Sequence, residues 1–220
     1  MSSVSQMDAP LLERALRRGH ARLGLVDFLD EIVDPLLHQI GSLWQEGEVR
    51  VAEEHLVTGV VRDFLSTLAI GPVGRRDATG IVLATPTAQI HDLGLQMAAT
   101  VARVAGYDVT YLGCGLPSEE IVACIERTKS RALALSLVYP HRDDQLVREF
   151  ARLHRLLPPG VTIAVGGQAA PHYEVDLRKI RARIFTSLRE FQHWLDDGLA
   201  GRSESGIARI PGRERPGEVE

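Results

Sequence analysis

The chain has 220 residues, of which 45% are hydrophobic and 25% are charged, and its formal net charge is −4. This length suffices for one large domain or two small ones with a buried core, and the acidic balance excludes a protein that binds nucleic acid over its whole surface. Only two cysteines are present, no basic N-terminal leader is followed by an apolar stretch, and no apolar run is long enough to span a membrane, so we expect a cytoplasmic protein without membrane association.

The first part of the chain, residues 1–70, carries apolar side chains at helical spacing, which predicts a helical bundle. Pro35 interrupts the first apolar series and predicts either a kink or two helices end to end. We expect a break over residues 41–47 and a second helix from about residue 51 to residue 68. Residues 71–77 contain the Gly-Pro-Val-Gly breaker and are interpreted as a linker.

Beyond this linker, over residues 78–200, short β-rich runs alternate with amphipathic helices, a pattern typical of a parallel sheet with crossover helices. Five strands in this arrangement favour a flavodoxin-like or Rossmann-like doubly wound fold. The tail at residues 201–220 is rich in Gly, Pro, Ser and charge, and we expect it to be disordered. The expected strands are 80–84, 109–112, 132–137, 162–165 and 183–185, and the expected helices are 93–105, 118–128, 143–156, 174–180 and 188–199.

A histidine, His91, follows the first predicted strand, and a predicted helix begins just behind it. This order places one imidazole at the carboxyl edge of the sheet, where open α/β sheets bind their ligands. Neutral imidazole is also the commonest side-chain ligand of transition metals. His91 is therefore the candidate metal ligand, and a solvated or helix-capping loop histidine is the alternative.

Two further features fall on the same edge of the predicted sheet. Ser136 ends the third strand, and the pair Gly166-Gly167 follows the fourth. Paired glycines let the backbone approach a ligand closely, and a serine offers a hydroxyl where a bulky side chain would close a groove. Each also has a purely structural explanation, because Gly-Gly is a common turn and a core serine can bond to the backbone.

Together these residues resemble the cobalamin-binding domain of methionine synthase, corrinoid mutases and methyltransferases, whose pattern is Asp-x-His-x-x-Gly, Ser-x-Leu and Gly-Gly. The match spans roughly residues 79–199. The resemblance implies base-off, histidine-on binding, in which His91 is the lower axial ligand of cobalt and Asp92 belongs to the same cofactor-binding segment. In the same resemblance Gly94 is the glycine at the start of the helix, and Ser136, Gly166 and Gly167 line the pocket for the nucleotide tail of cobalamin.

The chain departs from this pattern at two positions of the implied cofactor site. Gln89 stands where the family has an acid two positions before the ligand, and Val138 stands at the leucine of the serine motif. A carboxylate would raise the basicity of the imidazole and relay a proton, whereas an amide oxygen only accepts the bond and holds the tautomer. Gln89 therefore favours stable cobalt binding and counts against a methyl carrier.

The helical part contains Trp44 followed, after nine residues, by Glu54-His55. This spacing resembles the Trp-x9-Glu-His signature of light-sensing cobalamin domains, known from the adenosylcobalamin-dependent repressors of carotenoid genes. The resemblance implies that these three residues cover the upper face of cobalamin and pack around the adenosyl group. The alternative is a Trp44 that anchors the core and a Glu54-His55 pair on a solvated helix face.

In those photoreceptors a histidine directly after the tryptophan captures cobalt once the adenosyl group has left. Gln45 occupies that position here, so His55, His141, His172 or water would take its place.

We therefore interpret the chain as a stand-alone cobalamin-binding photosensor rather than an enzyme. Photolysis of adenosylcobalamin would change its conformation, its homo-oligomeric assembly or its binding to a signalling protein, without direct contact with nucleic acid. Two alternatives remain open: a corrinoid methyl carrier of a methyltransferase system, and an antirepressor that holds cobalamin or heme. A bilin beside the corrin is a further option for which the sequence fixes no site.

Overall fold

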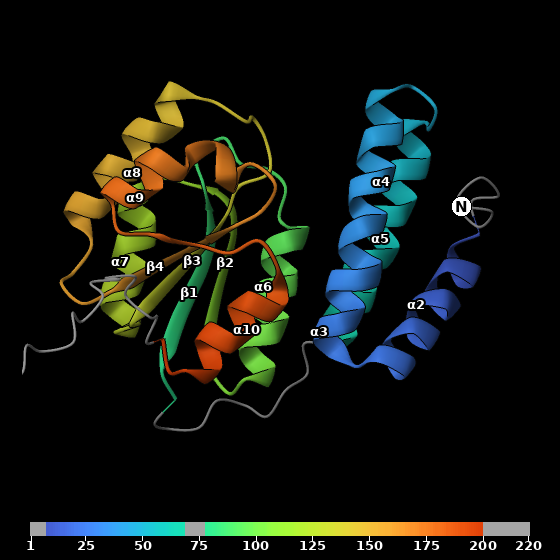
Figure 1. The fold of residues 1–220 in the computed structure, drawn as a ribbon, viewed down its shortest axis with the longest axis horizontal. Helices are drawn as coiled ribbons and strands as arrows, with labels where there is room; N and C mark the ends of the chain where they lie inside the picture. The colour runs from blue at the N-terminus through green and yellow to red at the C-terminus, as the bar shows by residue number, and fades with distance from the viewer. Residues whose placement is uncertain (1–7, 69–77, 200–220) are drawn as a thin grey trace, which may run out of the picture.

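The computed structural model describes residues 8–68 and 78–199 (Figure 1). The linker expected at residues 71–77 and the tail expected at 201–220 lie outside the described residues. The N-terminal part is helical and the part from residue 78 onward is α/β, as the two hydrophobic periodicities predict. Among the described residues, no helix combines the length and apolar character needed to cross a bilayer.

The N-terminal part folds into three long helical runs. The middle run is continuous from residue 25 to residue 45, because a π-helical segment joins its two α-helices. This wide turn precedes Pro35, which sits in the first turn of the next α-helix, where a missing N–H breaks no intrahelical bond. The segments are α2 (Ala9–Leu23), α3 (Leu25–Phe28), the π-helix η1 (Leu29–Val33), α4 (Asp34–Gln45) and α5 (Val51–Leu68).

The junction predicted at Pro35 is confirmed, and the break predicted over residues 41–47 is too early. Helix α4 continues through Gly41 to Gln45. One glycine costs a helix only about 1 kcal/mol, and the neighbouring Ile40 is fully buried and holds the turn in place.

The α/β part contains one five-stranded sheet in the order β2-β1-β3-β4-β5, with every pair parallel. This is the order of flavodoxin-like doubly wound sheets, so the predicted fold class is confirmed. The strands are β1 (Gly80–Pro86), β2 (Asp108–Leu116), β3 (Ala132–Ser136), β4 (Thr162–Gly166) and β5 (Arg183–Ile184).

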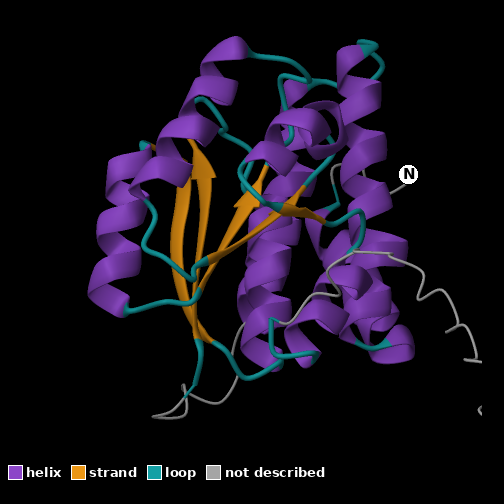
Figure 2. Cartoon of the chain, turned by 60° about the vertical axis from the view of Figure 1, so that its left-hand side comes forward, coloured by secondary structure: helices purple, strands orange, loops and turns teal. Residues whose placement is uncertain are grey.

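Helices cover both faces of the sheet (Figure 2). Along β1, Ile81 and Leu83 join the core on one face, while Val82 and Ala84 join the core on the other. Helices α6 (Leu93–Val104) and α10 (Leu188–Asp196) cover the first face. The second face is covered by α7 (Ser118–Thr128), α8 (Asp144–Leu156), the 3-10 helix η2 (Ala170–Tyr173) and α9 (Glu174–Lys179).

The bundle packs on the outer side of α6 and α10. Helix α5 contacts α6, and α3 and η1 contact α10. Buried residues of the bundle, such as Phe28 and Val61, belong to the same hydrophobic cluster as Leu83 of the sheet. The two parts therefore share one continuous core, and the bundle is fixed beside the helix that follows the His91 loop.

Candidate functional site

His91 lies in the loop of residues 87–92 that joins β1 to α6, and its side chain is exposed. From β1 the chain crosses to β2 on one side of the sheet, while β3 pairs with β1 on the other side. The carboxyl ends of β1 and β3 therefore flank the switch point of the sheet, where doubly wound folds bind ligands. The structure thus presents one free-standing imidazole at the expected place.

Buried hydrogen bonds hold the loop that carries His91. The Thr85 hydroxyl donates to the Gln89 carbonyl oxygen at 2.6 Å and accepts from the Gly115 N–H at 2.9 Å. The Gln89 side chain is only 1% exposed and spans to the loop after β3. Its amide nitrogen donates to the Tyr139 carbonyl oxygen at 2.6 Å, and its Oε1 accepts from the Val138 N–H at 2.9 Å. The loop after β1, the end of β2 and the loop after β3 are therefore joined into one platform.

These bonds give Gln89 a different task from the one expected. Instead of orienting His91, the amide bonds the backbone of Val138 and Tyr139. The reason is its burial, because a buried amide needs both its donor and its acceptor satisfied, and the loop after β3 offers one of each.

Asp92, the residue after His91, connects the platform to the bundle. Its carboxylate accepts two hydrogen bonds from the Arg62 guanidinium of α5, at 2.8 and 3.0 Å, and one from the Tyr111 hydroxyl of β2 at 3.0 Å. Burial by itself would raise the pKa of Asp92, but the Arg62 hydrogen bond and charge, helped by Tyr111, outweigh it and lower the pKa. Burial and the negative charge of Asp92 raise the pKa of Tyr111, so both groups keep their charge states at neutral pH.

The Ser136 hydroxyl is buried and has no hydrogen-bond partner within the part of the chain that the structure describes. It faces the first turn of α6, where a Cβ added to Gly94 would come to 3.4 Å from its oxygen. A buried hydroxyl without a partner is costly, and such a group at a ligand-binding edge indicates a site for a ligand atom. Gly94, which the sequence interpretation places at the start of the helix, keeps that space free of side chain.

Gly166 is the last residue of β4 and pairs with Ser136 at the end of β3, and Gly167 follows it. Gly167 has a φ of +95°, and a Cβ added there would lie 2.3 Å from the Leu137 carbonyl oxygen. Gly167 therefore allows the backbone after β4 to approach the backbone of Leu137 closely. Gly166 is less constrained, since its added Cβ would only touch the Phe185 carbonyl at 3.7 Å. Contact of either glycine with a cofactor tail stays a prediction.

The three residues of the expected cap lie around the turn between α4 and α5. Trp44 is 47% exposed, which excludes the alternative of a core anchor. Glu54 bonds His55, with 2.6 Å between the carboxylate oxygen and Nδ1, and the His55 side chain is 74% exposed. Gln45, the last residue of α4, is exposed as well. Figure 1 places this turn and the carboxyl ends of the strands at the same end of the molecule.

The two other candidate histidines lie on the sheet part of the molecule. His141 follows β3 and His172 lies in η2, and their rings approach to 4.5 Å between centroids. Both are exposed. They occupy the same rim as His91, on loops after neighbouring strands, and not the cap.

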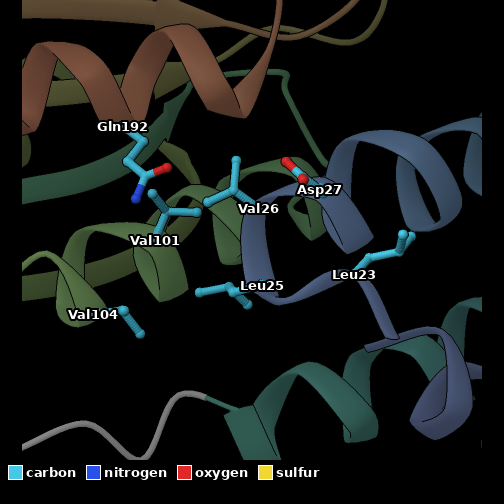
Figure 3. Close-up of a pocket in the computed structure, with 7 residues that line it drawn as sticks. All are labelled: Leu23, Leu25, Val26, Asp27, Val101, Val104 and Gln192. Carbon is cyan, nitrogen blue, oxygen red and sulfur yellow. The ribbon is translucent and has the colours of Figure 1, made fainter. Parts of the chain in front are cut away.

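One pocket of about 200 Å³ lies at the opposite end of α6 from His91 (Figure 3). Leu25 and Val26 of α3 face Val101 and Val104 of α6 across it, and Gln192 of α10 borders it. It contains none of the candidate site residues, and it marks a loosely filled part of the interface between the bundle and the sheet part.

Sequence reasoning missed Thr85, Arg62 and Tyr111, all of which hold the His91 segment. Arg62 and Tyr111 are 30 and 19 residues from Asp92 in the chain, so no local spacing announces their contact. Thr85 could have been identified from a weak sequence signal, because a polar residue at the end of a buried strand needs a hydrogen-bond partner.

The residues present fit a corrinoid. An exposed imidazole can reach a metal held by a macrocycle, the unpartnered Ser136 hydroxyl can serve a polar tail, and the exposed Trp44 offers an apolar surface on the facing helices.

Comparison with known proteins agrees with this geometry. Two family models, each described as a B12 binding domain, match residues 79–185 and residues 2–69. The chain is 30% identical over 202 residues to the HTH-type transcriptional repressor CarH of Myxococcus xanthus, covering 91% of this chain and 65% of that protein. It is 25% identical over 193 residues to the HTH-type transcriptional repressor CarA of the same organism, covering 86% of this chain and 64% of that protein.

Among solved structures, the Methanosarcina barkeri monomethylamine corrinoid protein has the same fold, with a TM-score of 0.68 and 14% identity, covering 90% of this chain and 95% of that one. The chain spans slightly less than two thirds of the length of the two repressors it matches. Because both the helical and the α/β part are matched, the chain belongs to the B12-binding domain family and is a cobalamin-binding relative of the CarH repressor.

Proposed function

We propose that the protein is a light sensor that holds adenosylcobalamin between the His91 platform and the α4–α5 turn. The observation that carries this proposal is the pairing of an exposed imidazole with a buried, unpartnered hydroxyl, Ser136, on one rim of the sheet. The relationship to a repressor of which this chain spans 65% supports a regulatory task over a catalytic one.

In this proposal His91 is the lower ligand of cobalt. Ser136, Gly94, Gly166 and Gly167 border the tail of the cofactor, beside the backbone bonds that fix the ends of β3 and β4. The bound group supplies a cobalt–carbon bond that visible light breaks. Trp44 supplies an apolar wall above it, and the Glu54–His55 pair supplies polar groups for a ribose or an adenine.

The helical part is the element that responds. Trp44 and His55 are exposed without a ligand, so the cofactor gives the α4–α5 turn contacts that it otherwise lacks. Without the upper ligand the α4–α5 turn would lose those contacts, and the bundle would present a different surface to a second copy or to a signalling protein. His55 is the histidine of the turn itself, and it takes the role of replacement ligand that Gln45 cannot fill.

The rival function is a corrinoid methyl carrier. Its fold is the same, as the corrinoid protein of Methanosarcina barkeri illustrates, but a fold supports many functions. The amide of Gln89 is bonded to the backbone after β3, and it offers no carboxylate to adjust the basicity of His91 while cobalt changes oxidation state.

The test is to load the purified protein with adenosylcobalamin in the dark and record its visible spectrum and its size in solution before and after green light. The proposal predicts a spectral change with a change in size or in hydrodynamic radius. A sample loaded with hydroxocobalamin is the matched control, and it should change in neither. An adenosylcobalamin sample that keeps both spectrum and size under light would contradict the proposal.

A further inference from the structure

The bond between Arg62 and Asp92 joins the helix that carries part of the proposed cap to the loop that carries His91. Asp92 is the residue directly after His91, and it occupies the N-cap position immediately before α6. Arg62 belongs to α5, and its two terminal nitrogens bond the two carboxylate oxygens at 3.0 and 2.8 Å. This two-pronged geometry fixes the direction of the carboxylate as well as its distance.

Tyr111 completes the arrangement from the sheet side. Its hydroxyl donates to the same carboxylate at 3.0 Å, so Asp92 is bonded by the bundle and by β2 at once. The Asp92 side chain is mostly buried, while Arg62 remains about half exposed. The three residues form a unit that we call the Asp92 anchor. Gln96, one turn further along α6, reaches Ser66 of α5 at 3.1 Å and extends the same contact.

Helix α5 carries Arg62 and also the Glu54–His55 pair of the proposed cap. Arg62 lies eight positions after Glu54 in the chain, which is about 12 Å along a helix axis. Residues 51–68 form one uninterrupted α-helix, so a displacement at its first turns is transmitted to Arg62. The upper part of the proposed site is therefore one rigid helix away from the residue beside the lower ligand.

A second connection between bundle and sheet part lies away from the strand ends. The Asp30 carboxylate, in the π-helical segment, accepts from the N–H groups of Leu188 and Arg189 at 2.8 and 2.9 Å and so caps the start of α10. The Arg189 guanidinium also bonds Asp27 at 2.7 Å. This connection holds the bundle without touching the His91 loop, and it provides a matched control.

We propose that the Asp92 anchor is a positioning unit, through which the docking of α5 sets the position of the His91 loop and cobalamin binding at His91 in turn tightens the docking of α5. The inference rests on the proposed cobalamin site. Its reciprocal form follows from linkage, because any contact that stabilises ligand binding is itself stabilised by the ligand. Light and the upper ligand act on α5 through Glu54–His55, and the anchor carries that change to the lower side.

The test compares three variants. Arg62→Gln removes the charge at the Asp92 anchor, Arg189→Gln makes the same chemical change at the second connection, and Arg62→Lys keeps the charge at the anchor. Backbone hydrogen exchange is measured for the His91 loop and for α5, without ligand and with hydroxocobalamin. In the unchanged protein hydroxocobalamin is expected to slow exchange in both segments. In Arg62→Gln it should slow exchange in the loop alone, and its affinity should fall about fivefold.

Arg189→Gln should retain slowed exchange in both segments, and Arg62→Lys should recover part of the protection of α5. A general loosening of the interface would affect both glutamine variants alike, so it is distinguishable. Full protection of α5 in Arg62→Gln would overturn the inference.

If the unchanged protein bound no hydroxocobalamin, the proposed function would be contradicted, but the positioning role of the Asp92 anchor would still be tested by hydrogen exchange in the ligand-free samples. Arg62→Gln must then exchange faster than Arg189→Gln in the His91 loop, and an unchanged loop would overturn the positioning role as well.

Discussion

The platform below the proposed cofactor and the cap above it are built in opposite ways. In the platform, Thr85 and Gln89 are fully buried, and their hydrogen bonds tie the loop after β1 to the end of β2 and to the loop after β3. In the cap, Trp44 is about half exposed, and within the described part of the chain the His55 side chain bonds only the adjacent Glu54. In the proposed function, the preformed platform would fix the position of the cofactor, and the open cap would gain contacts when the cofactor binds. The cap is therefore the part suited to change with the state of the ligand.

Two left-handed glycines, one in each region, give the largest expected effects. Gly167 of the platform has a φ of +95° and a Leu137 carbonyl oxygen in the way of any Cβ. We expect Gly167→Ala to lower the free energy of unfolding by at least about 3 kcal/mol, from backbone strain and displacement of β3 together. Urea unfolding of the ligand-free protein measures it.

The matched control is Gly47→Ala in the turn of the cap, where φ is +76° and nothing lies within 4 Å of the added Cβ. Only backbone strain remains, so the loss should be about 1 kcal/mol. Equal losses at the two positions would contradict the distinction between a packed platform and an open cap.

Trp44→Ala tests whether the cap contributes to cobalamin binding without contributing to the stability of the ligand-free protein. Since the indole is half exposed, ligand-free stability should change by less than about 1 kcal/mol, whereas the adenosylcobalamin dissociation constant should rise about tenfold. Val175→Ala, at an exposed apolar residue on α9, is the control and should alter neither quantity. A large loss of ligand-free stability with unchanged affinity would assign Trp44 to the bundle core.

Ser136→Ala is expected to have effects of opposite sign on stability and binding. Removing an unpartnered buried hydroxyl should raise the free energy of unfolding of the ligand-free protein by about 1 kcal/mol. Removing a partner of the cofactor tail should weaken cobalamin binding about fivefold. Thermal unfolding and a spectral titration give the two values, and reduced stability with unchanged affinity would show that the hydroxyl serves the fold alone.

The smallest expected effect is the pH dependence of the stability that Asp92 contributes at acidic pH. The pKa of Asp92 in the folded protein is lowered from the usual value of about 3.9, so its contribution to stability is present above that value and is lost as the pH falls through the lower folded pKa. Asp92→Asn should therefore cost roughly 1 kcal/mol at pH 7, and the difference from the unchanged protein should shrink below about pH 4. A difference that is the same at pH 3 and pH 7 would contradict a charge-based anchor.

The sequence was informative where structure is local or repeats along the chain. Buried β-rich runs alternate with amphipathic helices because each parallel strand requires a crossover, so five strands and the order of elements were predictable. The ends of the strands were less predictable. β1 extends to Pro86 and β2 to Leu116, past their predicted ends, because the Gly115 N–H of β2 donates a hydrogen bond to the Thr85 hydroxyl of β1. The π-helical segment was not predicted, and no local pattern reveals the contact of its Asp30 with the start of α10.

The site divides in the same way. His91 and Ser136 were predictable because their positions at strand ends determine where they lie. The hydrogen-bond partner predicted for Gln89 was wrong. The buried amide forms its hydrogen bonds with the backbone of Val138 and Tyr139 and not with His91. The role of Asp92 depends on a guanidinium 30 residues earlier, and only the packing of α5 on α6 brings the two together.

The visible spectrum of cobalamin bound to His91→Ala, beside His141→Ala, tests the central claim most directly. If His91 is the lower ligand, His91→Ala should retain little or no corrinoid and show a base-on spectrum for any that remains. His141→Ala changes a histidine on the same rim and should keep the uptake and base-off spectrum of the unchanged protein. Full uptake with an unaltered spectrum in His91→Ala, or no uptake by the unchanged protein, would contradict the account.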